Sequence, residues 1–195
     1  MFVKEINCPN IAESHATIIE LVTSATQELF EFYGLQATLV ACLDSAFSNE
    51  TDVSIVGLLG AAADGFRSTI AIETNFKILE ATYPAKLEEL ETNDTQHLQD
   101  WIGELTNQLV GRFKNKLMHY GCDLCLGVPS VIQGDNLKAI LPKKTEAITL
   151  KFDTNINHNI YILVNTMIDA ANFKLEYQTL PEGNSIMGEG EFMFF

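Results

Sequence analysis

A long amphipathic pattern between His97 and Met118 constrains the fold of this chain more than any other stretch. Its apolar side chains recur at spacings of three and four residues, which predicts a helix of about five turns. The recurring residues are Ile102, Leu105, Leu109 and Phe113. At about 100° per residue these side chains form one stripe. The stripe must be covered by another layer of structure, so we expect this helix to lie on the core.

The opposite side of the same helix is polar. Asp100, Glu104, Asn107 and Gly111 fall within an arc of about 60°. Acids and amides on such a face are usually only solvated, and periodicity alone favours that interpretation. Gly111, however, costs roughly 1 kcal/mol relative to alanine in mid-helix. A residue without a side chain, in line with an acid and an amide, would let the backbone of a partner approach closely.

The spacing of these residues matches a known motif: Asp or Ser, three residues, Glu, two residues, Asn, and a Pro further along. Here the first three positions are Asp100, Glu104 and Asn107, and Pro129 follows after twenty-one intervening residues, one fewer than in the motif. The pattern resembles the signature of the CheC/CheX/FliY phosphatases of bacterial chemotaxis, closest to the CheX type. The resemblance is strongest over residues 97–135 and extends over 10–166.

A second copy of the motif occurs on an earlier helix in CheC and FliY members. The nearest frame in this chain has Ser24 and Glu28, but Glu31 stands where the motif requires Asn. We therefore expect one active centre, as in the CheX type.

The resemblance implies an enzyme that hydrolyses the phospho-aspartate of a CheY-type response-regulator receiver domain. By carry-over, Asn107 would orient the attacking water and Glu104 would pair with the receiver's lysine. Asp100 would support Glu104 or the docking surface, and we assign clearance for the partner to Gly111. The protein would need no cofactor of its own, since the receiver supplies Mg²⁺, and would form a homodimer built through its sheets.

Two alternatives remain open at this stage. The chain could be a CheX-like adaptor that binds a receiver or another signalling partner without catalysis, although an adaptor need not keep the water-positioning amide of Asn107. It could also be a plain structural partner domain, which would make the motif match a coincidence. The shortened spacing before Pro129 and the extension over residues 168–195 keep the adaptor in consideration.

The remaining periodicity predicts an α/β (α+β) fold, in which two long helices pack on an antiparallel or mixed sheet. Besides the helix at 97–118, the sequence predicts a helix over 11–33 that stops at Gly34, and a shorter helical region from Asn75 interrupted at Pro84. Strands are expected at 37–43, 53–62, 66–73, 122–128, 130–133, 138–141, 147–153, 159–167 and 173–179. Asp64 and Gly65 form a hairpin turn, and Gly57 and Gly60 indicate close packing against a helix.

Length and composition indicate one domain over residues 1–195, with 47% hydrophobic and 19% charged residues. A net charge of −14 disfavours nucleic acid and anionic membrane surfaces as partners. The chain shows neither a transmembrane run nor a signal peptide, so we expect a cytoplasmic protein.

Metal binding is not expected either. Cys122 and Cys125 have CxxC spacing, but in a strand they would point to opposite faces, so reduced structural thiols are predicted at all four cysteines. The four histidines are scattered and indicate surface or capping residues.

Overall fold

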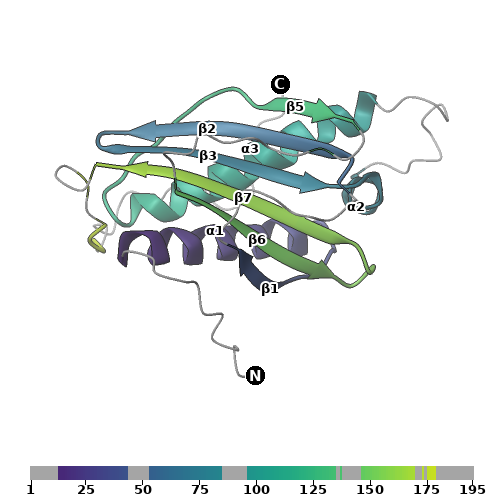
Figure 1. Cartoon of the computed structure of the whole chain (residues 1–195), viewed down its shortest axis with the longest axis horizontal. Coiled ribbons are helices and arrows are strands. Elements are labelled where there is room, and N and C mark those ends of the chain that lie inside the picture. The colour runs from purple at the N-terminus through teal and green to yellow at the C-terminus, as the bar shows by residue number, and fades with distance from the viewer. Residues whose placement is uncertain are drawn as a thin grey trace.

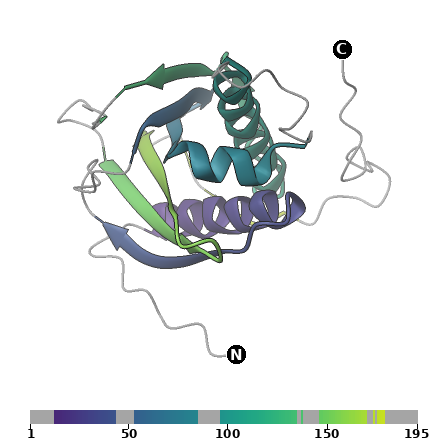
Figure 2. The same ribbon diagram turned by 90° about the vertical axis from the view of Figure 1, so that its right-hand side faces the viewer.

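The fold is α+β, with three helices on one face of a seven-stranded antiparallel sheet (Figures 1 and 2). The structure is a computed structural model, and it describes residues 13–43, 53–84, 96–134, 137, 146–169, 173 and 175–178. The predicted fold class is confirmed, and the sheet is antiparallel rather than mixed.

The two long helices lie where the periodicity predicts them. Helix α1 spans Glu13–Phe32 and helix α3 spans Gln96–Met118, while the short helix α2 spans Phe76–Thr82. Gly34 has a φ of 77° and ends α1, since this left-handed conformation lets the Leu35 amide donate to the Phe30 carbonyl at 2.9 Å. Asn75 caps α2 by accepting hydrogen bonds from the Lys77 and Ile78 amides.

The sheet has the spatial order β1-β6-β7-β3-β2-β4, and β5 also pairs with β2. The strands are β1 (Ala37–Leu43), β2 (Ile55–Ala63), β3 (Phe66–Thr74), β4 (Cys125–Leu126), β5 (Ser130–Gln133), β6 (Glu146–Thr154) and β7 (Asn159–Ile168). The expected hairpin joins β2 to β3, where Ala63 pairs with Phe66 across Asp64 and Gly65. Figure 2 shows α3 on the side of the sheet where β5 lies and α1 on the side of β1.

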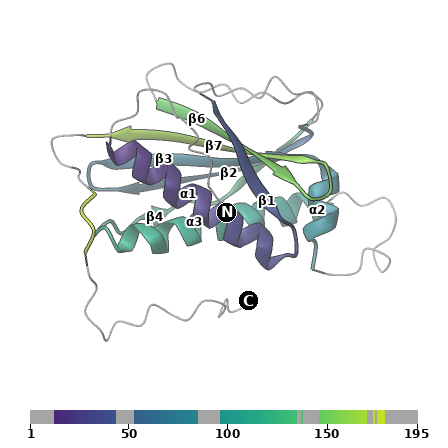
Figure 3. The same cartoon turned by 90° about the horizontal axis from the view of Figure 1, so that it is seen from below.

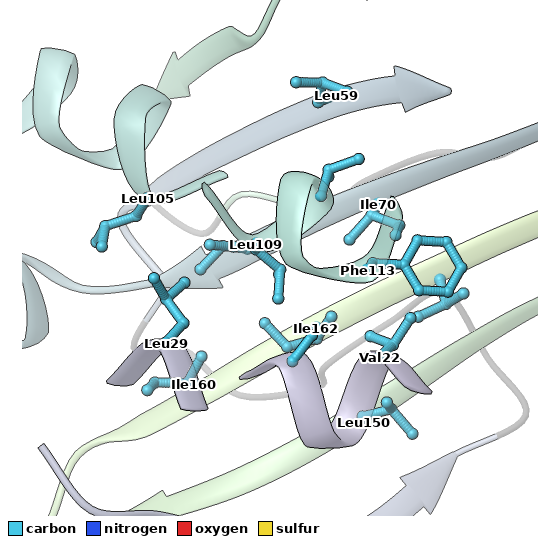
Figure 4. Packing of buried hydrophobic residues seen from close by; sticks show 14 of the residues in the cluster. Val22, Leu29, Leu59, Ile70, Leu105, Leu109, Phe113, Leu150, Ile160 and Ile162 are labelled. Atoms are coloured by element: carbon cyan, nitrogen blue, oxygen red, sulfur yellow. The ribbon is translucent and has the colours of Figure 1, made fainter. Parts of the chain in front are cut away.

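The main core lies between the helices and the sheet (Figure 4). The predicted stripe of α3 is buried there, and it meets side chains from α1 and from the central strands. The members labelled in Figure 4 are Val22, Leu29, Leu59, Ile70, Leu105, Leu109, Phe113, Leu150, Ile160 and Ile162. The polar side of α3 is consequently left facing away from the sheet.

Gly57 explains how closely α3 approaches β2. A Cβ atom at Gly57 would lie 2.3 Å from Thr106 Oγ1 and 2.9 Å from the Ile102 carbonyl oxygen. Such distances are impossible for real atoms, so the helix can lie this close only because residue 57 has no side chain. The predicted packing role is confirmed for Gly57 but not for Gly60, where the nearest atom to a Cβ would be the Ser68 carbonyl oxygen at 3.9 Å.

Two strand predictions are wrong. The stretch predicted at 122–128 forms only the two-residue strand β4, and Cys122 precedes it in irregular structure. Residue 173 and residues 175–178 form no strand, although the alternating pattern predicts one over 173–179. The predicted strand at 138–141 lies outside the described residues.

Candidate functional site

Helix α3 presents a polar ridge on its solvent side, made of Asp100, Glu104, Asn107 and Gly111. The first three side chains are exposed and Gly111 is partly exposed, while Gly103 on one side of them and Gln108 on the other are buried. The Asp100 carboxylate accepts a hydrogen bond from Gln96 Nε2 at 2.9 Å. Asn107 makes no hydrogen bond to any residue that the structure describes. Its amide is therefore available to a molecule that docks on the ridge.

On one side the ridge borders the C-terminal end of α1, which lies beside α3 in Figure 3. The Gln108 Nε2 atom donates to Glu104 Oε1 at 2.8 Å, and Gln108 Oε1 accepts from the Tyr33 hydroxyl at 2.9 Å. One turn further, the Arg112 guanidinium carbon lies 5.7 Å from the centre of the Phe32 ring, within cation–π range. These contacts fix the end of α1 against the ridge.

On the other side the ridge borders β5. The side chains of Gln99 and Gln133 are hydrogen-bonded, and a Cβ on Gly103 would lie 3.5 Å from Val131 Cγ2. Along these two contacts β5 runs beside the N-terminal half of α3 in the opposite direction.

Two large apolar side chains are exposed on the segments that lead to and from the elements bordering the ridge. Phe32 is 67% exposed on the α1 side, and Val128 is 85% exposed before β5. Exposed side chains of this size beside a polar strip are typical of a surface that binds another protein.

In the incomplete copy of the motif on α1, the carboxylate of Glu28 is bound by other side chains of the protein. Glu28 Oε1 accepts hydrogen bonds from Lys116 Nζ at 2.6 Å and from Ser24 Oγ at 2.9 Å. Partial burial would raise the pKa of Glu28, but the hydrogen bonds from Lys116 and Ser24 and the charges of Lys116 and Arg112 outweigh it and lower that pKa. Glu28 is therefore an anchor between α1 and α3, which agrees with a single centre on α3.

A separate shallow hollow opens between the sheet and the N-terminal part of α3. It is lined by Ser54, Phe76, Gln99, Gln133 and Gly134. None of the four ridge residues lines it, so the chemistry of the ridge belongs to an open surface rather than to a cavity.

Metal-ligating residues do not gather within the described ranges. No group of three or more His, Cys, Asp and Glu side chains in that part of the chain could share an ion. Cys122 is buried and Cys125 is exposed. The two cysteines do not share a strand, as the prediction of opposite faces assumed, because Cys122 precedes β4. His15 is 8% exposed, and the expectation that every histidine is a surface or capping residue is wrong for it. No helix in the described residues is long and apolar enough to cross a membrane.

Four residues around the ridge were missed by sequence reasoning: Phe32, Tyr33, Gln108 and Arg112. The sequence gives a weak indication of Gln108 and Arg112, because polar residues at 104, 108 and 112 form a row along one border of the polar side of α3. Nothing in the sequence pairs them with the end of α1, and only the packing of the two helices does.

Comparison with known proteins adds an independent line of evidence. The family model described as "Chemotaxis phosphatase CheX" matches residues 53–153, which include all of the ridge. A search of curated proteins gave no match.

Solved structures of low sequence identity share the fold. CheX from Vibrio vulnificus is 17% identical with a TM-score of 0.67, over 77% of this chain and 99% of that one. CheX from Desulfovibrio desulfuricans is 20% identical with a TM-score of 0.64, over 76% and 97% of the two chains. The Borrelia burgdorferi CheX–CheY–BeF3–Mg²⁺ complex gives 18% identity and a TM-score of 0.61, over 77% and 97%. Because the family model covers just over half of the sequence and the fold agrees, this chain belongs to the CheX chemotaxis phosphatase family.

Proposed function

We propose that this protein hydrolyses the phospho-aspartate of a CheY-type receiver domain. The observation that carries the proposal is the ridge itself, where an exposed amide without a hydrogen-bond partner among the described residues stands one turn from an exposed carboxylate. A homologous CheX has been crystallised with CheY, BeF3 and Mg²⁺, which supports a receiver as the partner. BeF3 is chemically a stand-in for the phosphoryl group.

The chemistry needs little from this chain. An aspartyl phosphate is an activated acyl phosphate, and the receiver contributes the Mg²⁺ and the lysine that neutralise charge on the phosphoryl oxygens. What is missing is a water held in line with the bond between phosphorus and the aspartate oxygen. As that water forms its bond to phosphorus, the aspartate leaves as a carboxylate, and the water's proton passes to phosphate or solvent.

Asn107 is suited to hold that water. Its amide both donates and accepts hydrogen bonds and does not titrate, so it can orient a water molecule at any physiological pH. Orienting a reactant in this way lowers the barrier of the chemical step rather than the free energy of docking. In our proposal Glu104 pairs with the receiver's lysine, and Asp100 supports the same docking surface. Because Asn107 and Glu104 lie on the same helix, α3 brings the amide and the carboxylate to the receiver as one rigid unit.

The test is the decay of a phosphorylated receiver from the same genome, with Mg²⁺ and catalytic amounts of the protein. We expect the wild-type protein to accelerate decay and Asn107→Ala to lose at least about 100-fold in kcat, while its affinity for the BeF3-treated receiver changes little. Asn115→Ala is the matched control, because Asn115 is an exposed amide on the same helix, two turns further on.

Two outcomes would contradict the proposal. Full turnover by Asn107→Ala would remove the water-positioning role. If the wild-type protein accelerates the decay of none of the receivers, yet still binds one, the chain is an adaptor rather than a phosphatase.

A further inference from the structure

Glu104 is not a free side chain on the ridge, because two residues outside the motif hold it. Its Oε1 accepts from Gln108 Nε2 at 2.8 Å, and Gln108 in turn accepts from the Tyr33 hydroxyl at 2.9 Å. Tyr33 follows the last residue of α1, whereas Gln108 and Glu104 lie on α3. The chain of hydrogen bonds therefore runs from one helix to the other and ends on the exposed carboxylate.

The Tyr33 hydroxyl decides which way the Gln108 amide points. The two ends of an amide are chemically different, since its oxygen only accepts and its nitrogen only donates. With the hydroxyl donating to Oε1, the NH₂ group must face Glu104. Gln108 is only 8% exposed, so water cannot easily replace either partner.

Tyr33 is itself held by aromatic packing. Its ring meets the Phe32 and Trp101 rings edge-on, each with centroids 5.0 Å apart. The Trp101 Nε1 atom donates to Thr82 Oγ1 at 3.0 Å, which connects this cluster to α2. The hydroxyl of Tyr33 thus comes from a rigid position rather than from a mobile loop end.

We propose that Tyr33 and Gln108 are positioning residues that hold the Glu104 carboxylate in the conformation in which it meets the receiver's lysine. This inference rests on the proposed function of the ridge. A carboxylate can accept about four hydrogen bonds, so the one from Gln108 leaves room for a lysine. Ordering Glu104 before docking also removes an entropic cost that would otherwise weaken the complex.

Kinetics on the phosphorylated receiver test the proposal. Tyr33→Phe removes the hydroxyl but keeps the ring, and Gln108→Leu removes both hydrogen bonds at similar volume. We expect each variant to raise KM about three- to tenfold with kcat unchanged, because docking is weakened and the water on Asn107 is not. In a Glu104→Ala background, Tyr33→Phe should have no further effect, since nothing is left for it to position.

Thr26→Val is the matched control. It removes a buried hydrogen bond within α1, which Thr26 Oγ1 donates to the Val22 carbonyl at 2.8 Å, and Thr26 takes part in none of the contacts described above for Glu104, Gln108 and Tyr33. Its KM should equal that of the wild type even if its stability falls. The proposal is overturned if Tyr33→Phe and Gln108→Leu keep the wild-type KM, if they lower kcat instead, or if Tyr33→Phe adds its full effect to Glu104→Ala.

A measurement without any receiver separates this inference from the proposed function. In nitrogen-15-labelled protein, the side-chain amide signals of Gln108 should shift in Glu104→Ala and in Tyr33→Phe, but not in Thr26→Val. If the wild-type protein dephosphorylates none of the receivers, the proposed function fails and these signals alone decide whether the positioning contacts exist. Unchanged Gln108 signals in Glu104→Ala would overturn them.

Discussion

Gly111 stands on the ridge of α3 in open space, and outside its chain neighbours and the backbone of its own helix no atom lies within 4 Å of the position that a Cβ would occupy. The protein's own packing therefore does not require a glycine there. Gly111→Ala should raise the free energy of unfolding by about 0.5–1 kcal/mol, because glycine is a poor helix former. If the receiver backbone approaches at this point, the added methyl group should at the same time raise KM about tenfold. Urea unfolding and receiver dephosphorylation measure the two effects.

Asn115→Ala serves as the control for Gly111→Ala, since it also improves helix propensity on the exposed side of α3 but lies one turn beyond the ridge. We expect it to leave KM unchanged. A Gly111→Ala protein that is more stable and keeps the wild-type KM would show that the partner does not come close to residue 111.

At this scale the sequence predicts the ridge but not what holds it. Asp100, Glu104 and Asn107 share one face because helix geometry alone fixes their relation over two turns. Tyr33 and Gln108 are 75 residues apart, and their hydrogen bond depends on how α1 and α3 cross. No local pattern contains that angle, so the contact could not be predicted from the sequence.

The contact between α3 and β2 depends on Gly57. An alanine there would bring its Cβ against Thr106 Oγ1 and the Ile102 carbonyl, and the helix backbone cannot move aside without disturbing the core. We expect Gly57→Ala to lower the free energy of unfolding by about 1–3 kcal/mol, the usual range for overpacking. Because α3 would shift as a whole, receiver dephosphorylation should fall as well.

Gly60→Ala is the matched control for Gly57→Ala. Gly60 belongs to the same strand, but its Cβ would meet only the Ser68 carbonyl oxygen at 3.9 Å, an ordinary contact distance. Its unfolding curve should stay within about 0.5 kcal/mol of the wild type. Equal losses of stability in the two variants would mean that the close approach of α3 is not what makes residue 57 sensitive.

Elements with a strong period were predicted well, and the misses have a tertiary cause. Residues 173–179 alternate like a strand, yet β7 is already paired with β3 on one side and β6 on the other. The segment that follows β7 in the chain therefore cannot pair with β7, because both edges of β7 are already hydrogen-bonded. Instead Phe173 stacks on Phe66 with centroids 5.0 Å apart, and Tyr177 stacks on His119. Side-chain packing thus replaces the backbone pairing that the pattern suggests.

At the scale of the whole molecule, the sheet separates two apolar clusters. The larger one lies under the helices, and a smaller one lies on the other face of the sheet around Val53, Val56, Ala71, Tyr161 and Leu163. The homodimer that the family resemblance implies stays a prediction, as does a single domain over residues 1–195.

Glu73 lies on that second face, 4% exposed, and pairs in register with Val56 and Tyr161. Burial raises the pKa of Glu73 from 4.5 to about 7. The folded protein therefore binds the proton of Glu73 more tightly than the unfolded chain does. Because of this, the contribution of Glu73 to the free energy of unfolding is greatest below pH 4.5, decreases as the pH rises, and stops changing above about pH 7. At 1.36 kcal/mol per pH unit the loss amounts to about 3 kcal/mol.

Glu73→Gln keeps the shape of the side chain but cannot ionise. It should remove this part of the pH dependence and be more stable than the wild type at pH 8. The exposed control Glu20→Gln should follow the wild type. Urea unfolding between pH 4 and 8 measures the difference, and parallel curves for wild type and Glu73→Gln would mean that residue 73 does not titrate with folding.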